Sequence, residues 1–169
     1  MAKRVYSIDT IIPTATADTV ALVNGTYVGA WKGASVTQRT YIDEIFIGGQ
    51  ATASAPTFMQ LARDSTVGVG AQSGGDDGPL DPATAALAAP VGVGNSFATS
   101  APQRDVAAKL LHLDLNCFGG QAKFKSLAAD RSDSPVLVGN TASFGEASLS
   151  AFTGGTPGAF GCHVIYETM

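Results

Sequence analysis

The C-terminal stretch, residues 139–169, constrains the fold more than any other part of the sequence. It holds two segments, 147–152 and 160–166, whose side chains alternate with the period of a pleated strand. A Gly-Gly pair at 154–155 and a Pro-Gly pair at 157–158 stand between them and break regular structure. Because a last strand must pair with strands formed upstream, the stretch predicts an all-β domain, and taken alone it predicts a C-terminal hairpin.

Size and composition fit a single β-rich domain. The chain has 169 residues, enough to bury a core without metals or disulfides. Only 14% of the residues are charged and 20 are glycine, which favours strands and turns over helices.

Charge and hydropathy disfavour two classes of partner. The net charge is −4 and the basic residues are scattered, whereas a nucleic-acid-binding protein needs a clustered basic face. No apolar run approaches the roughly 18 residues that span a bilayer, and the N-terminus has no signal-peptide pattern. We therefore expect no nucleic acid, no membrane span and a cytosol-like compartment.

Strand-like segments recur along the chain at short, fairly regular spacing. Residues 36–47 predict a long central strand and residues 57–63 a second one. The cleanest alternation is at 107–117, where leucines face one way and His112, Asp114 and Asn116 the other. Counted from Val36, about eight such strands favour a sandwich or a jelly roll.

Residues 1–35 are predicted to form an N-terminal arm or an edge hairpin. Asn24-Gly25 is a strong two-residue turn signal between the apolar runs 20–23 and 27–31. The β-sandwich domain is then expected to cover residues 36–169.

One short helix is predicted from Pro82 to Ala89. Asp81 is a good N-cap, Pro82 suits the first helical position, and Pro90 ends the run. This helix closes a Gly-rich connection that begins at Thr66, and a connection of that length is typical of a loop that contacts a partner.

No pattern predicts a catalytic, cofactor or metal site, so we expect the protein not to be an enzyme. Asp76, Asp77 and Asp81 cluster, but their spacing matches no calcium-binding loop. His112 and His163 fall on the polar phases of their strands, which is more typical of solvated or interface histidines than of a paired site. The sequence contains neither a nucleophile elbow nor a phosphate-binding loop.

Cys117 and Cys162 are the only cysteines, and both fall on the apolar phase of a strand. This position favours two buried thiols that act as small apolar side chains. A disulfide, within one chain or between chains, is the alternative, and it requires Cα atoms within about 7 Å.

Three segments of the chain resemble jelly-roll head decoration (cement) proteins of tailed bacteriophages: Glu44–Gly68, Gly78–Pro90 and Gly139–Glu167. The resemblance implies a jelly-roll sandwich of about eight antiparallel strands that binds the outside of a capsid and bridges its major capsid subunits. The implied partners are the major capsid protein and further copies of the chain in a homotrimer. The implied locations are the virion surface and, during assembly, the host cytoplasm.

A capsid-binding role calls for apolar, shape-complementary faces, in which aromatic residues are enriched. The alternative function is a carbohydrate- or receptor-binding module of a virion fibre or tail, because jelly rolls often bind glycans. In a jelly roll the last two strands belong to opposite sheets, so residues 153–159 become a corner rather than a hairpin turn. Six residues are candidates for partner contacts, although the aromatic ones fit the core equally well: Tyr6, Tyr27, Trp31, Leu80, Phe97 and Phe152.

Overall fold

The described part of the chain is entirely β and antiparallel. It contains thirteen strands and no helix, and therefore no helix long and apolar enough to cross a membrane. The computed structural model describes residues 4–9, 26–33, 36–49, 51–66, 72–73, 77–83, 92–94, 96–97, 103–139, 145–153 and 160–169.

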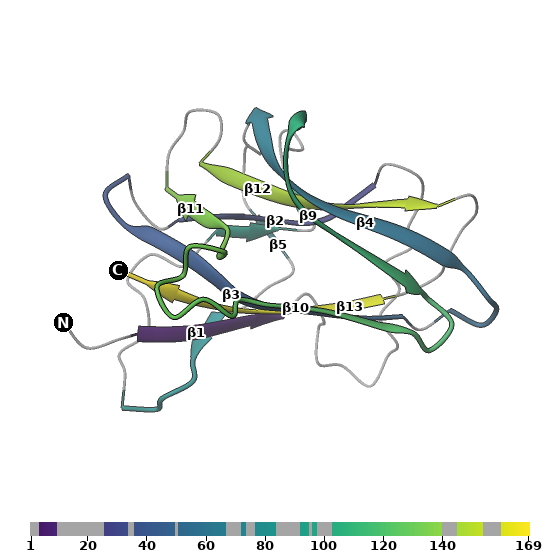
Figure 1. Cartoon of the computed structure of the whole chain (residues 1–169), viewed down its shortest axis with the longest axis horizontal. Helices are drawn as coiled ribbons and strands as arrows, with labels where there is room; N and C mark the ends of the chain where they lie inside the picture. Colours follow the sequence, from purple (N-terminus) through teal and green to yellow (C-terminus); the bar gives the residue numbers. More distant parts are fainter. Residues whose placement is uncertain are drawn as a thin grey trace.

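The long strands form two sheets that face each other (Figure 1). Sheet A contains β10 (Gln121–Lys125), β3 (Arg39–Gly49), β13 (Phe160–Thr168), β1 (Arg4–Asp9) and β6 (Asp77–Pro79), in that order, and β11 (Val136–Val138) pairs with β3. Sheet B contains β7 (Gly92–Gly94), β2 (Thr26–Lys32), β12 (Glu146–Thr153), β4 (Pro56–Thr66) and β9 (Gln103–Asn116). A small third sheet pairs β5 (Gln72–Ser73) with β8 (Ser96–Phe97).

The core lies between the inner faces of the two sheets. Strand alternation turns one side chain in two inward, and β3 follows this rule with buried Ile42, Ile45 and Ile47. Burial of each such side chain contributes about 1.5–3 kcal/mol relative to its exposure. The core residues from the other strands include Trp31, Met59, Leu61, Leu115, Leu137, Leu149, Val164 and Tyr166.

The two described strands of the first 35 residues, β1 and β2, are interior strands, each paired on both sides. Strand β1 pairs with β13 on one side and β6 on the other, and β2 pairs with β12 and β7. These strands therefore build the sheets instead of an edge hairpin, and the predicted hairpin partner at 20–23 lies outside the described residues. The division at residue 35 stays a prediction.

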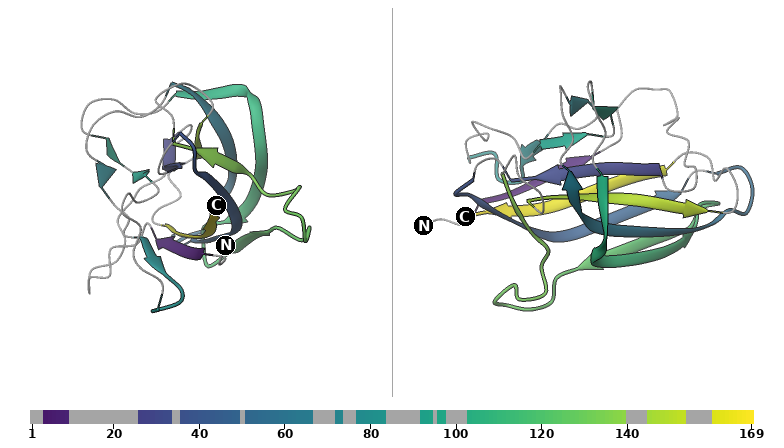
Figure 2. Two further views of the ribbon diagram at one scale, coloured as in Figure 1. Left: turned by 90° about the vertical axis from the view of Figure 1, so that its left-hand side faces the viewer. Right: turned by 90° about the horizontal axis from the view of Figure 1, so that it is seen from above.

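Successive strands cross from one sheet to the other. Leu149 pairs with Gly29 and Leu61 in sheet B. Val164 pairs with Ile8 and Ile45 in sheet A. Strands β12 and β13 thus lie in opposite layers (Figure 2), so the prediction of a corner between them is confirmed and the prediction of a hairpin is wrong.

Two other expectations are not met. Asp81 Oδ1 accepts a hydrogen bond from the Ala83 N–H at 2.9 Å, as a cap would, but Pro82 and Ala83 form a turn and residues 84–89 lie outside the described residues. The predicted helix is therefore unsupported. The count of about eight strands is not confirmed either, because five additional strands of two or three residues are present.

Candidate functional site

The residues predicted to contact partners have different environments. Trp31 is 1% exposed and belongs to the core, so it is not a surface anchor. Leu80 is 54% exposed and follows β6. The backbones of the remaining four lie in β1, β2, β8 and β12, but their side chains lie outside the described part: Tyr6, Tyr27, Phe97 and Phe152.

Both cysteines are buried thiols that form no disulfide. Cys117 and Cys162 are 0% and 1% exposed, and no disulfide joins them. Cys117 Sγ donates to Thr57 Oγ1 at 3.3 Å. A disulfide to another chain would require either thiol to leave the core, so the expectation of small apolar packing groups fits both cysteines.

Several exposed aliphatic side chains lie at or near one end of sheet A, spread across its width. Val36 precedes β3 and is 67% exposed, and Met169 is 61% exposed. Two backbone hydrogen bonds, of 3.1 and 3.0 Å, join Met169 to Arg39 at the start of β3. Leu80 lies toward the same end of the sheet. It follows Pro79, which pairs with Tyr6, and β1 begins at this end because Arg4 pairs with Thr168. We call these three residues and Leu127 the apolar end.

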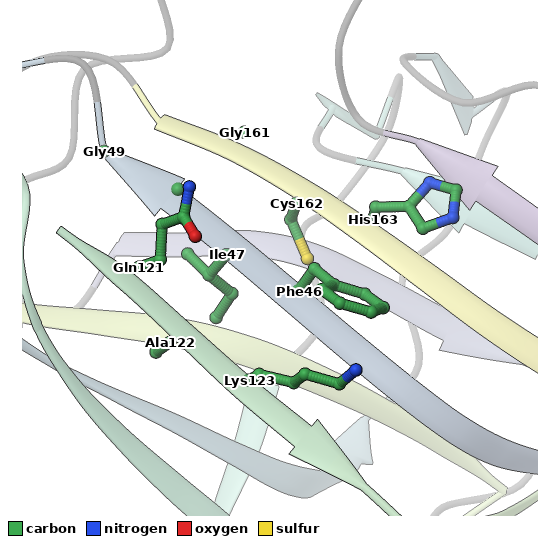
Figure 3. A pocket seen from close by; sticks show the side chains of 10 residues that line it. Phe46, Ile47, Gly49, Gln121, Ala122, Lys123, Gly161, Cys162 and His163 are labelled. Atoms are coloured by element: carbon green, nitrogen blue, oxygen red, sulfur yellow. The ribbon is translucent and has the colours of Figure 1, made fainter. Parts of the chain in front are cut away.

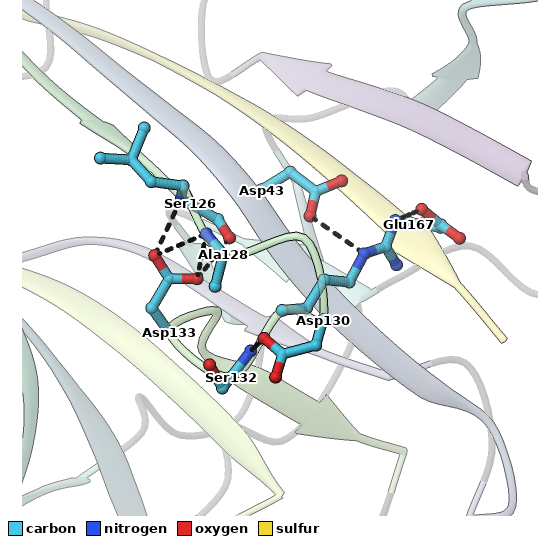
Figure 4. Close-up of polar contacts among 9 residues, drawn as sticks. Asp43, Ser126, Ala128, Asp130, Ser132, Asp133 and Glu167 are labelled. Atoms are coloured by element: carbon cyan, nitrogen blue, oxygen red, sulfur yellow. Dashed lines mark hydrogen bonds and ion pairs between the residues drawn. The ribbon is translucent and has the colours of Figure 1, made fainter.

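Leu127 belongs to a loop, residues 126–135, that follows β10 toward the apolar end. The side chain of Leu127 is 85% exposed, although its backbone is firmly held. The Asp133 carboxylate accepts hydrogen bonds from Ser126 Oγ at 2.6 Å and from the Leu127 N–H at 2.8 Å (Figure 4). These bonds, with one from the Ala128 N–H, hold the pKa of Asp133 below its usual value.

Arg131 fastens this loop to the outer face of sheet A. Its guanidinium forms an ion pair with the buried Glu167 and lies 4.0 Å from Asp43 Oδ1 (Figure 4). It also lies over the Tyr41 ring, 5.5 Å from the ring centroid. The residue has a φ of 60°, a left-handed conformation that is strained for a side-chain-bearing residue. The loop backbone that carries Leu127 is therefore held in place before binding, which lowers the backbone entropy lost on binding.

A groove of about 650 Å³ lies on the outer face of sheet A, where β10, β3 and β13 run side by side (Figure 3). Two rows of residues cross it. Lys123, Phe46 and His163 are cross-strand neighbours in the first row. Gln121, Gly48 and Gly161 form the second row, where the two glycines leave bare backbone as the floor.

The first row contains the charged side chain of the groove, Lys123, next to two aromatic rings. Lys123 Nζ lies 4.2 Å from the centroid of the Phe46 ring, and the Phe46 and His163 ring centroids are 6.1 Å apart. Glu44, one row further along, accepts ion pairs from Lys125 at 2.6 Å and Lys123 at 3.2 Å. The hydrogen bond from Lys125 is the main cause that lowers the pKa of Glu44, so this carboxylate is ionised at neutral pH.

The described part of the chain keeps the two histidines apart and holds no cluster that could bind a metal ion. His163 lies on the outer face of sheet A, whereas His112 lies in sheet B beside the Phe58 ring, at 5.2 Å between centroids. No three histidine, cysteine or acidic side chains of the described residues gather closely enough to hold a metal ion. The polar phase correctly predicted that both histidines lie away from the core.

The groove corresponds to no sequence motif, and the Gly48-Gly49 pair is typical of the end of the strand predicted at 36–47. Strand β3 continues through both glycines, and both pair with β13. A glycine at the outward phase of a strand, at Gly48 and again at Gly161, was the available signal.

Comparison with protein-family models, curated proteins and solved structures found no match to the chain.

Proposed function

We propose that this protein is a non-enzymatic structural component of a phage virion, which binds the outside of the capsid and bridges its major capsid subunits. We also propose that its sandwich is a jelly roll. Eight strands have five residues or more, and they follow the orders β10-β3-β13-β1 and β2-β12-β4-β9. The connections β3 to β4, β9 to β10 and β12 to β13 all change sheet, which supports the jelly-roll path.

The apolar end is the observation that carries the proposed function. Val36, Leu80, Leu127 and Met169 are each more than half exposed, and each lies at or toward the end of sheet A where β3 begins. Exposed aliphatic side chains along one end of a sheet favour an interaction with another protein there. The hydrogen-bonded loop that holds Leu127 further favours a preformed contact with another protein.

Attachment to a shell suits a surface of this kind. Contacts from a few aliphatic side chains are individually weak, but many copies on one capsid, or three chains in one trimer, raise the effective affinity. We therefore propose that the apolar end contacts the major capsid protein and that the protein forms a homotrimer. In a symmetric trimer, contacts between chains also protect strand edges that a single sandwich exposes.

The test is binding to capsids of the virus that encodes the chain, assembled without this protein. Sedimentation should show that the wild-type protein co-sediments with these capsids and raises their melting temperature. The double variant Leu80→Ser with Leu127→Ser should bind more weakly by about tenfold or more, because it removes two aliphatic contacts.

Phe118→Ser is the matched control. Phe118 is 59% exposed, but it lies in the turn after β9, beside the far end of β3. It is roughly 30 Å along that strand from Arg39 and roughly 20 Å from Leu127. It should bind like the wild type. Wild-type protein that fails to co-sediment with the capsids contradicts the proposed function, and binding that depends on Phe118 contradicts the assignment of the apolar end.

A further inference from the structure

Gly48 is a glycine that the fold does not require. It lies inside β3, with Gln121 of β10 on one side and Gly161 of β13 on the other. A Cβ atom placed on Gly48 meets no heavy atom within 4 Å. Glycine inside a strand costs about 0.5–1 kcal/mol relative to alanine, and it often marks a place where a ligand approaches the backbone.

The two glycines make the floor of the groove accessible. Gly48 and Gly161 are directly paired, and their neighbours Ile47 and Cys162 turn inward to the core. A flat ligand can therefore lie against two adjacent strands without contacting a side chain from below. A volume of about 650 Å³ is in the size range of small-molecule sites.

The walls offer one apolar surface and several polar groups. The Phe46 ring stands at one end of the floor, and Gln121, Lys123 and His163 surround it (Figure 3). Amide, ammonium and imidazole groups supply both donors and acceptors of hydrogen bonds. A sugar ring matches this lining because it has apolar C–H faces and hydroxyl groups on one rigid frame.

Other ligand classes fit this lining less well. An extended peptide cannot add to the sheet here, because β3 and β13 are both paired on each side. A nucleic-acid strand needs a row of basic side chains along its phosphates, and the described residues beside this groove supply only Lys123 and Lys125.

The local charge favours an anionic sugar. At one end of the groove, Lys123 and Lys125 place two ammonium groups that share the single carboxylate of Glu44. At the other side, Asp9 is the cross-strand neighbour of His163. The excess positive charge therefore lies at the Lys123 end. This positive site stands on a chain with a net charge of −4. An acidic ligand therefore gains a charge-assisted bond that a neutral one lacks.

We propose that this groove binds an acidic saccharide. One sugar ring lies on the floor formed by Gly48 and Gly161 against the wall formed by Phe46, and its carboxylate faces Lys123. On a capsid-bound protein, such a site would attach the particle to an acidic glycan surface.

The test is an NMR titration of the ¹⁵N-labelled full-length protein with sialyllactose, with tri-galacturonate and with neutral lactose. At least one acidic probe should bind with a Kd of about 1 mM and lactose about tenfold more weakly, because the site is small, open and positively charged. The shifts should be confined to residues 46–49, 121–123 and 161–163. Absence of saturable shifts with both acidic probes, or equal affinity for lactose, overturns the proposal.

Two variants locate the site independently of capsid binding. Gly48→Val should fill the groove and weaken acidic-sugar binding by about tenfold or more. Its matched control, Gly78→Val in β6, also adds a Cβ where nothing lies within 4 Å, and it should bind normally. Lys123→Gln should weaken binding of the acidic probes and leave lactose unchanged. Unchanged binding by Gly48→Val overturns the proposal, whereas capsid binding by the same variant reports only on the apolar end.

Discussion

Gly48 and Gly49 are adjacent in one strand, yet packing requires a glycine only at Gly49. A Cβ on Gly49 would lie 2.3 Å from Cys117 Cα and from its carbonyl oxygen, so the inner face of β3 requires glycine there. A Cβ on Gly48 would meet nothing, so the outer face leaves that position open. The inner face of sheet A is therefore determined by packing, whereas the outer face is available for binding.

The largest expected difference in stability between the two faces of β3 is between substitutions at Ile45 and at Phe46. Ile45 is fully buried, so Ile45→Ala should lower the free energy of unfolding by about 3–4 kcal/mol through lost burial and a cavity. Phe46 is only half-buried on the outer face, so Phe46→Ala should cost about 1 kcal/mol. Urea denaturation measures both variants. Equal losses contradict the assignment of the two faces.

The two glycines allow the same comparison with one substitution. Gly49→Val should lower the free energy of unfolding by about 3 kcal/mol, because the Cys117 backbone cannot move aside as a side chain can. Gly48→Val should be neutral or stabilise the protein by up to about 1 kcal/mol, since it removes a strand-interior glycine. Thermal unfolding of both variants checks this prediction. A destabilised Gly48→Val variant shows that the open floor is a requirement of folding.

Substitution of Arg131 tests whether contacts on the outer face of sheet A also stabilise the fold. Arg131→Met leaves the buried Glu167 without its guanidinium partner, and it should lower the free energy of unfolding by about 2 kcal/mol, less than for a fully buried pair. Glu167→Gln in the same chain should recover most of this loss, because no buried charge remains. A double variant as unstable as Arg131→Met argues that packing, not charge, is what matters.

Acid should loosen the loop of residues 126–135 before it unfolds the sheets. The pKa of Asp133 is lowered in the folded protein, first by the Ser126 hydroxyl, so its ionisation stabilises the loop above the ordinary value of about 3.9. That stabilisation is lost as the pH falls through the lowered pKa. Protection factors, which correct for the intrinsic slowing of amide exchange in acid, should therefore fall at low pH for the Leu127 and Ala128 amides but not for β3. Asp133→Asn should exchange rapidly at neutral pH, and slow exchange in that variant contradicts the role of the carboxylate.

The sequence predicted the local pattern better than the long-range arrangement. Alternation identified the strands around residues 39–49 and 56–66, and His112 and Asp114 are exposed on β9 as it indicated. The glycines after Thr153 correctly predicted a change of sheet once a jelly roll was assumed. The role of residues 4–9 as an interior strand could not be predicted, because pairing with β13 and β6 depends on contacts distant in sequence.

The candidate sites were harder to predict because they form only after folding. The groove joins Gly48, Gln121 and Gly161, which are far apart in the sequence and meet only through strand register. Aromatic character alone suggested Trp31 as a contact residue, yet the same apolar surface placed it in the core. Leu127 and Val36 carry no sequence signal that separates an exposed leucine or valine from a buried one.

The most direct test of the proposed function is to locate the protein on a virion by electron cryomicroscopy. The account predicts density for a two-sheet domain on the outside of the capsid, in contact with more than one major capsid subunit. The end that carries Val36, Leu80, Leu127 and Met169 should face the shell. Density confined to a fibre or tail, or absence of the protein from the capsid surface, would contradict it.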